Sequence, residues 1–477
     1  MKPPLPISVV DLFAGPGGLG EGFSRVEDGA GRKVFKTVIS IEKDPYARQT
    51  LRLRAFYRHH RDSRTRLPDA YLRVLKANTT REKSLALDQL AHEPMWKRVC
   101  DEIPEWVRGG RKSCELGPDN LEIHAAIKDR LKGEPNWILI GGPPCQAYSL
   151  VGRSRMRNHE GLIQDARHFL YREYLAVIRK FRPTIFVMEN VKGLNTAKVA
   201  GMPILPMIMK DLESAGYALK SIAQSELPGD FMVKSERFGV PQTRHRMIIV
   251  GVRLSEIGLA EKLRPIEQGQ VVETVQNAIS GLPKLAALDS STPRAQVKES
   301  LRGKPCIERE CECYFESRKL VKFITSRSPQ LSGLIFNHEA RSHMPEDLKR
   351  YQWWVDNATE TTSPRLNGKI PKSLLPKHRN STAGGASAFS DRFKVQVSGR
   401  PCGTITSHIS KDGHYYIHYD RTQARSFSVR EAARIQTFPD DYFFMGNRTQ
   451  QYHQVGNAVP PYLAYQIAQR VWAALKG

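Results

Sequence analysis

The sequence predicts an α/β protein whose main domain is a doubly wound, Rossmann-like sheet, accompanied by a smaller and less regular domain. Short apolar runs typical of buried parallel strands alternate with helix-like segments up to residue 252. A glycine-rich turn follows the first of these runs. From residue 253 the alternation fades, and Pro, Gly, Ser and Thr become frequent up to about residue 425.

The N-terminal segment has the order of a nucleotide-binding unit. Residues 7–12, ISVVDL, are typical of a buried strand, and FAGPGGLGEGF forms a glycine-rich turn that opens a helix near Leu19. The run KTVISIE (36–42) predicts a second strand that ends in the acid Glu42. In doubly wound sheets such a turn and such an acid hold a nucleotide-like ligand. A tight turn without a ligand is the alternative, which the acid at the strand end disfavours.

Three more strands and an insertion are predicted before residue 253. The strands are NWILIGG (136–142), TIFVMEN (184–190) and RMIIVGV (246–252). Residues 51–135 predict a long helical insertion, which starts with the six arginines of LRLRAFYRHHRDSRTR. Such a charge run favours a solvated face over contact with DNA phosphates.

Regular structure resumes after the second domain. We expect residues 1–252 and 426–477 to form the main domain together, with 253–425 standing apart. Pro460 and Pro461 suit the entrance of a C-terminal helix. The buried face of that helix is predicted from apolar residues four positions apart: Leu463, Ile467, Val471 and Leu475.

Composition favours a polyanionic partner. Lys and Arg outnumber Asp and Glu by 73 to 49, a net charge of +24, and phosphate neutralisation dominates protein–DNA affinity. A merely soluble basic surface is the alternative.

No apolar run is long enough to span a membrane, and the N-terminus lacks a signal-peptide pattern, so we expect an intracellular protein. Seven scattered cysteines fit a reducing compartment.

The carboxyl ends of the predicted strands carry the chemically useful residues. Such ends meet at one cleft in a doubly wound sheet. Cys145 follows two prolines, so its thiol stands on a rigid turn, which favours a nucleophile over a buried structural cysteine. Glu189 is suited to donate a proton, with an ion pair or a helix cap as the alternative. The four strand ends are Asp11–Gly20, Glu42, Pro143–Ser149 and Glu189–Val191.

Six ordered motifs make the sequence resemble the DNA (cytosine-5) methyltransferase family, of the bacterial restriction-modification type. DLFAGPGGLG is similar to the S-adenosylmethionine loop, GGPPCQAYS to the catalytic loop, and ENV to the cytosine-binding element. QTRHR matches the family's paired arginines, and REAARIQTFPD and GNAVPP match its two C-terminal signatures. These motifs cover about half of the chain. The resemblance implies a class I methyltransferase domain, with 253–425 as the target-recognition domain.

The resemblance implies S-adenosylmethionine as cofactor. Glu42 would take the ribose hydroxyls, Phe13 would lie near the adenine, and Asn457 and Val459 would close the pocket. The implied cofactor-binding residues are Asp11, Phe13, Ala14, Gly15, Gly17, Gly18, Leu19, Glu42, Pro143, Asn457 and Val459.

The resemblance also implies methyl transfer to C5 of a flipped-out cytosine in double-stranded DNA. Cys145 would attack C6, Glu189 would protonate or hydrogen-bond N3, and Arg246 would orient the base, while segment 150–167 closes over it. The implied catalytic residues are Cys145, Glu189, Arg244 and Arg246. The implied substrate-binding residues are Pro144, Gln146, Ser149, Asn190, Val191, Gln242, Thr404 and Thr406.

Three alternative functions stay open. A tRNA cytosine-5 methyltransferase shares GGPPCQ and ENV but usually has a smaller second domain. A non-catalytic DNA-binding protein predicts a decayed catalytic position, and a small-molecule methyltransferase does not need the charge of +24. The expected setting is a monomer in a bacterial cytoplasm, bound to DNA. A cognate restriction endonuclease would act separately, and an orphan or phage-defence role is the other possibility.

Two questions stay open at this level. The acid that contacts the cofactor adenine is not assigned, with Glu115, Asp119 and Glu122 as candidates. No metal site is expected. The cysteines at 306, 311 and 313, with His338 and His343 downstream, are interpreted as ordinary thiols rather than zinc ligands.

Overall fold

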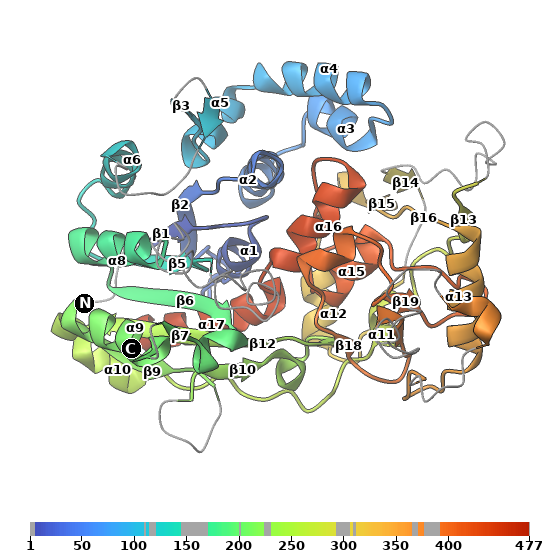
Figure 1. Cartoon of the computed structure of the whole chain (residues 1–477). Coiled ribbons are helices and arrows are strands. Elements are labelled where there is room, and N and C mark those ends of the chain that lie inside the picture. Colours follow the sequence, from blue (N-terminus) through green and yellow to red (C-terminus); the bar gives the residue numbers. More distant parts are fainter. Residues whose placement is uncertain are drawn as a thin grey trace.

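A computed structural model gives the fold of the chain (Figure 1). It describes residues 5–108, 111–113, 121–144, 170–199, 202–223, 230–291, 306–308, 312–364, 371–375 and 392–476. Cys145, Gln146 and Ser149, and the predicted closing segment 150–167, lie outside these residues. No helix within the described ranges is both long and apolar enough to cross a membrane.

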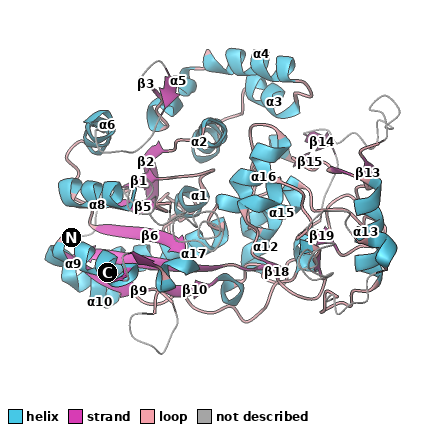
Figure 2. Ribbon diagram, viewed as in Figure 1, coloured by secondary structure: helices cyan, strands magenta, loops and turns pink. Residues whose placement is uncertain are grey.

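A seven-stranded sheet forms the centre of the molecule and confirms the predicted fold class (Figure 2). Its order is β10-β12-β6-β5-β1-β2, and β9 pairs with β12 beside β10. The pairs β1–β2, β1–β5 and β5–β6 are parallel, whereas β12 runs antiparallel to its neighbours. The strands are β1 (Ile7–Leu12), β2 (Phe35–Ile41), β5 (Trp137–Gly141), β6 (Ile185–Val191), β9 (Tyr217–Ser221), β10 (Met232–Lys234) and β12 (His245–Arg253).

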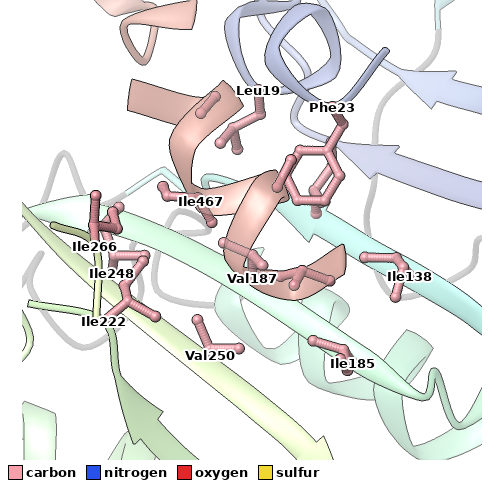
Figure 3. Packing of buried hydrophobic residues seen from close by; sticks show 14 of the residues in the cluster. Leu19, Phe23, Ile138, Ile185, Val187, Ile222, Ile248, Val250, Ile266 and Ile467 are labelled. Atoms are coloured by element: carbon pink, nitrogen blue, oxygen red, sulfur yellow. The ribbon is translucent and has the colours of Figure 1, made fainter. Parts of the chain in front are cut away.

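Helices cover both faces of the sheet, which is why its parallel strands are apolar on both sides. Helices α1 (Gly18–Ser24), α10 (Ile257–Lys262) and α17 (Pro461–Lys476) cover one face, and their apolar residues share a cluster with the strands. Figure 3 shows Ile467 of α17 over β6 and β12, whereas Leu19 and Phe23 of α1 lie towards the N-terminal strands, with the Phe23 ring centre 5.2 Å from that of Phe35 in β2. The other face carries α6 (Leu121–Leu131), α8 (Leu170–Phe181) and α9 (Ile204–Ser214).

The predicted C-terminal helix is confirmed. It begins at Pro461, directly after Pro460, and its expected apolar face is buried in the sheet cluster. Gly22 of α1 packs directly on it, because a Cβ at Gly22 would lie 2.4 Å from the backbone nitrogen of Tyr465. The last turns of the chain are therefore part of the sheet domain.

The range 51–135 begins inside helix α2 (Pro45–Asp62). The elements after α2 are α3 (Asp69–Lys76), α4 (Thr80–Ala91), α5 (Pro94–Glu102), the hairpin β3 (Trp106–Arg108) with β4 (Arg111–Ser113), and α6.

The expectation of a solvated arginine face is wrong for α2. Arg54 is buried between Glu21 and Asp441, at 2.5 and 2.8 Å, and Arg58 pairs with Glu102 at 2.9 Å. These acids lie far along the chain, so a local charge pattern could not reveal them.

Residues 253–425, called the second region below, consist of short elements (Figure 1). Its cluster of buried residues also includes α15 (Val429–Ile435) and α16 (Arg448–Asn457), so packing continues across residue 425. Among its described residues the second region also contains α10, which packs on the sheet, and the α-helices α11 (Val275–Ile279), α12 (Arg318–Thr325) and α13 (Pro345–Asp356). The remaining short strands within the described ranges are β7 (Lys198–Val199), β8 (Met202–Pro203), β11 (Gln242–Thr243), β13 (Leu288–Asp289), β14 (Cys306–Glu308), β15 (Leu334–Phe336), β16 (Ser342–His343), β17 (Val395–Gln396), β18 (Cys402–Gly403) and β19 (Ile417–His418).

Candidate active site

The predicted strand ends meet at the carboxyl edge of the parallel strands. The Gly15 N–H donates to Glu42 Oε2 at 2.7 Å, which joins the ends of β1 and β2. The Asn190 side chain donates to the Pro143 carbonyl at 3.3 Å, which joins the ends of β5 and β6. A parallel sheet brings these ends together because its strands all point the same way.

The glycine-rich loop is open on one side and closed on the other. Gly15 has φ +57°, and a Cβ added there meets no atom of the described chain within 4 Å. Gly18 has no such space, because its Cβ would lie 2.1 Å from the Val459 carbonyl oxygen. The backbone of the C-terminal segment therefore lies directly against the loop at Val459. Asn457 is exposed beside it at the end of α16.

Asp11 is a buried acid beneath this loop. Its side chain is 1% exposed, and neither carboxyl oxygen has a hydrogen-bond partner of normal geometry among the described residues. Burial raises the pKa of Asp11 to about 8, which the neighbouring Gly20 backbone amide and the more distant Arg58 charge only partly oppose. This carboxyl group is thus mostly protonated at neutral pH. Burial also raises the pKa of Glu42, although the Gly15 and Asp44 amides donate to it.

Two other expected cofactor residues have their side chains in hydrophobic cores. Leu19 packs in the sheet cluster, and Ala14 packs against the α2 side of the molecule. Phe13 is half-buried at the end of β1 with φ +56°, which is unusual for a residue with a side chain.

Glu189 and Arg246 form an ion pair at the neighbouring strand ends. The Arg246 Nε lies 2.8 Å from Glu189 Oε1, and both side chains are mostly buried. Glu189 also closes over Gly142, because a Cβ at Gly142 would lie 2.8 Å from Glu189 Oε2. Residue 142 stands three positions before Cys145, so the acid lies where the segment that leads to Cys145 leaves β5. Burial lowers the pKa of Arg246, which the Glu189 carboxylate opposes.

Arg244 does not share the Glu189 pair. Its side chain is buried and donates to two backbone carbonyls, Ile405 at 2.6 Å and Gly456 at 3.2 Å. Burial lowers its pKa, and the nearby Arg246 charge adds to this effect. Two guanidinium groups thus stand near one carboxylate.

Gln242 continues this junction. Its Oε1 accepts from the Ile405 N–H at 2.6 Å, and its Nε2 donates to Gln436 Oε1 at 3.1 Å. β11 pairs in parallel with β18, and Thr404 Oγ1 donates to the Thr243 carbonyl at 2.6 Å. The strand end that carries the paired arginines is therefore fixed against the second region.

The remaining expected substrate residues lie near this edge. Val191 stands opposite Arg246 in the β6–β12 register, and Pro144 is half-buried after β5. Thr406 is exposed, and its N–H donates to the Tyr416 hydroxyl at 3.1 Å.

Three residues that sequence reasoning missed hold this edge in place. Gln436 donates to the Val455 carbonyl at 2.8 Å, and Arg48 donates to the Lys43 carbonyl at 2.7 Å, next to Glu42. The Tyr442 hydroxyl donates to the Pro16 carbonyl of the glycine-rich loop. Gln436 lies inside the REAARIQTFPD motif, which could have signalled it, whereas Arg48 and Tyr442 carry no such signal.

The open questions of the sequence receive partial answers. Glu122 is exposed on α6, while Glu115 and Asp119 lie outside the described residues. His338 bonds to the Ser428 hydroxyl and the Pro283 carbonyl at 2.9 and 2.8 Å. No group of three or more metal-ligand side chains occurs in the described part of the chain, and Cys311 lies outside it.

Comparisons with known proteins identify the family. A family model described as C-5 cytosine-specific DNA methylase matches residues 122–473. The Type II methyltransferase M.Bpa9945I of Bacillus paralicheniformis is 33% identical over 476 residues, covering 98% of this chain and 99% of that protein. This chain belongs to the C-5 cytosine-specific DNA methylase family.

Other relatives agree with this assignment. The Type II methyltransferase M.DdeI of Desulfomicrobium norvegicum is 25% identical, covering 98% of this methyltransferase and 88% of that protein. A solved E. coli structure, described as a DNA modification methyltransferase encoded within a prophage, matches with a TM-score of 0.58 at 20% identity. The match covers 99% and 100% of the two chains and supports the fold. The methyltransferase therefore transfers a methyl group to C5 of cytosine in DNA, by the covalent mechanism that is general to its family.

Proposed function

We propose that the methyl donor is S-adenosylmethionine and that it binds between the glycine-rich loop and Glu42. The observation that supports this donor is the open space beside Gly15, bordered by the Glu42 carboxylate and closed by Val459 at Gly18. Glu42 would accept hydrogen bonds from the ribose hydroxyls. The protonated Asp11 beneath the loop adds no full negative charge to the pocket. When bound, S-adenosylmethionine supplies an electrophilic methyl group.

We infer that Cys145 is the nucleophile. C5 of cytosine is too electron-poor to attack a methyl group, and a bond from the thiolate to C6 makes it enamine-like. After methylation, the C5 proton leaves and the C6–sulfur bond breaks, which restores the aromatic ring and the thiolate. The base must first leave the helical stack, because neither face of C6 is accessible inside the duplex.

Glu189 and Arg246 would receive the flipped base. Protonation of N3 by Glu189 draws charge into the ring and stabilises the adduct. The position of Glu189 over Gly142 supports this role, since the acid lies beside the segment that leads to Cys145. Arg246 holds the carboxyl group through the 2.8 Å contact and is available to orient the base.

Arg244 is a positioning residue in this proposal. Its two bonds to the Ile405 and Gly456 carbonyls join the strand of Arg246 to the second region and to the cofactor-closing segment. Its guanidinium would act on the base only through these neighbours.

The second region would read the DNA sequence, with Thr404 and Thr406 near the target base, and residues 426–477 would complete the catalytic domain. The net charge of +24 supports a phosphate-rich substrate. The Type II names of the relatives support protection of host DNA beside a separate cognate endonuclease. We propose a cytoplasmic monomer.

The first prediction tests the nucleophile. Cys145→Ala should reduce methyl transfer from labelled S-adenosylmethionine to duplex DNA by at least about a thousandfold, because the route through the C6 adduct is lost. Affinity for DNA should stay within a few-fold. Cys100→Ala, a half-buried thiol on α5, is the matched control and should keep full activity. Retained activity in Cys145→Ala would refute the mechanism, and transfer to tRNA alone would refute the substrate.

A further inference from the structure

Helices α2 to α5 make direct contact with residues 328–336 of the second region, which we call the docking segment. The Leu67 N–H donates to Gln330 Oε1 at 2.7 Å, and Gln330 Nε2 donates to the Leu67 carbonyl at 3.1 Å. The Ser328 N–H donates to the Tyr57 hydroxyl at 3.0 Å. Leu67 is buried, so one glutamine side chain satisfies both of its backbone polar groups.

Strand β15 inside the docking segment belongs to two hydrophobic clusters. Leu334 and Phe336 pack in the cluster of α2 to α5, together with Leu331. Ile335, between them, packs in the cluster of α11, α12 and α15. Side chains of a strand alternate between its two faces, so the two faces of β15 pack in different hydrophobic clusters. A rotation of the second region would therefore disturb the packing of both clusters.

Helix α2 links the docking segment to the cofactor side of the sheet. Its N-cap, Asp44, lies two residues after Glu42 and accepts from the Tyr46 and Ala47 amides at 2.9 and 2.8 Å. The helix has 18 residues and is about 27 Å long. Tyr57, near its far end, contacts the docking segment. One helix therefore spans from the proposed ribose acid to the second region.

A separate support holds the second region at the active-site edge. There β11 pairs with β18, and Arg244 donates to Ile405. The docking segment is a different part of the second region, and it contacts helices α2 to α5 rather than β11 and Arg244. The second region is thus fixed to the sheet domain at several separate places, since Arg25 of α1 also donates to the Phe323 carbonyl of α12 at 3.1 Å. Separate contacts restrain rotation as one contact alone would not.

We propose that α2 to α5 act as a brace that sets the orientation of the second region relative to the catalytic sheet, with Gln330 as a positioning residue. This inference rests on the proposed role of the second region in reading DNA. A duplex that contacts both parts needs them in a fixed relation, because base contacts specify while phosphate contacts set the register. Loosening the brace weakens productive DNA binding and leaves the methyl-donor pocket intact.

The test is steady-state kinetics of Gln330→Ala with duplex DNA and S-adenosylmethionine. We expect KM for DNA to rise about tenfold, since two hydrogen bonds to buried backbone groups are lost. KM for the donor and kcat should stay within about twofold. Gln330→Glu still accepts from the Leu67 N–H and should be intermediate. Gln89→Ala, an exposed glutamine on α4, is the matched control and should match the wild type.

A milder second variant, Tyr57→Phe, keeps the packed ring and removes the hydroxyl, which accepts from the Ser328 N–H and also lies beside the Asp441 carboxylate. It should raise KM for DNA in the same direction by a smaller factor, and bisulfite sequencing should show more methylation outside the preferred site. The brace is refuted if KM for DNA is unchanged in Gln330→Ala and Tyr57→Phe, or if the donor KM and kcat change as much. Failure of the proposed function would give a different result from failure of the brace, because the wild type itself would then not methylate DNA.

Discussion

At the residue scale, the active-site edge combines acids in opposite electrostatic settings. Glu189 lies against the Arg246 guanidinium, whereas Asp11 is buried and has no described hydrogen-bond partner of normal geometry. Desolvation disfavours the charged form of an acid, which applies to Asp11. The two carboxyl groups therefore lie in different surroundings, although each ends or nearly ends a strand of the same sheet.

The Asp11 environment predicts a pH-dependent stability. The pKa of Asp11 is about 8 in the folded protein and about 3.9 in an unfolded chain. Between these values only the folded state holds the proton, so this group contributes stability at low pH that is lost as pH rises towards 8. The Asp11→Asn variant has no carboxyl group at this position, so it does not lose this part of its stability as pH rises. Its free energy of unfolding relative to wild type should rise by about 2–4 kcal/mol from pH 5 to pH 8, measured by urea unfolding.

The exposed Asp88 on α4 offers a matched control for this measurement. Asp88→Asn should give a pH profile of unfolding parallel to the wild type, because its side chain is on the surface. Parallel profiles for Asp11→Asn would show that the Asp11 carboxyl is ionised in the folded protein at neutral pH.

At the scale of elements, the methyl-donor loop is shaped by segments from distant parts of the chain. Helix α1 lies against α17, and the Val459 carbonyl occupies the space where a side chain at residue 18 would be. The Tyr442 hydroxyl also donates to the Pro16 carbonyl of this loop. Gly18 is therefore required by close approach of another backbone, since its own φ is not in the left-handed region.

This packing predicts the effect of a single methyl group. Gly18→Ala should lower the free energy of unfolding by about 1–3 kcal/mol, because the Cβ overlaps a backbone carbonyl that cannot rotate away. Affinity for S-adenosylmethionine should fall at least about tenfold as the loop and residue 459 separate. Isothermal titration and thermal unfolding measure both effects. Gly29→Ala, where a Cβ meets nothing within 4 Å, is the control, and equal behaviour of the two variants would contradict the packing argument.

At the scale of the whole molecule, the buried charges serve the structure and leave the remaining positive charge for a partner. Arg25, Arg54 and Arg61 surround Glu21 and Asp441 inside the protein, joining α1, α2 and the C-terminal segment. Removing one partner of such a network leaves a buried charge uncompensated, which typically costs about 3–5 kcal/mol. These arginines are therefore not available to DNA, and the surface must supply the phosphate contacts.

The net charge of +24 predicts a steep salt dependence of DNA binding. If about six to ten phosphates are neutralised, the Kd for duplex DNA should rise about a thousandfold or more between 50 and 200 mM salt. Fluorescence anisotropy with labelled duplex at several salt concentrations measures the slope. Affinity for S-adenosylmethionine should change little over this range, and a flat DNA response would contradict a phosphate-based interface.

The sequence by itself predicted five strands of the sheet and the order of the motifs, whose resemblance to a family indicated the chemistry, whereas β9 and β10 were not predicted. Parallel strands buried on both faces are recognisable as apolar runs, and their carboxyl ends must meet whatever the rest of the chain does. This is why Glu42 and Glu189 were predicted at one edge. Arg246 was expected only from the resemblance of QTRHR to the family's paired arginines, and the buried face of α17 from its apolar residues four positions apart.

Only the tertiary structure decided what depends on contacts between distant segments. The arginines of α2 were expected in solvent and are paired with acids up to position 441, because burial is set by neighbours and not by local pattern. The same reason explains why Arg244 bonds to Ile405 of the second region instead of pairing with Glu189. It also explains why the sequence did not predict the contact between Gln330 and Leu67. Local periodicity encodes which face of an element is buried, and folding alone determines which element it meets.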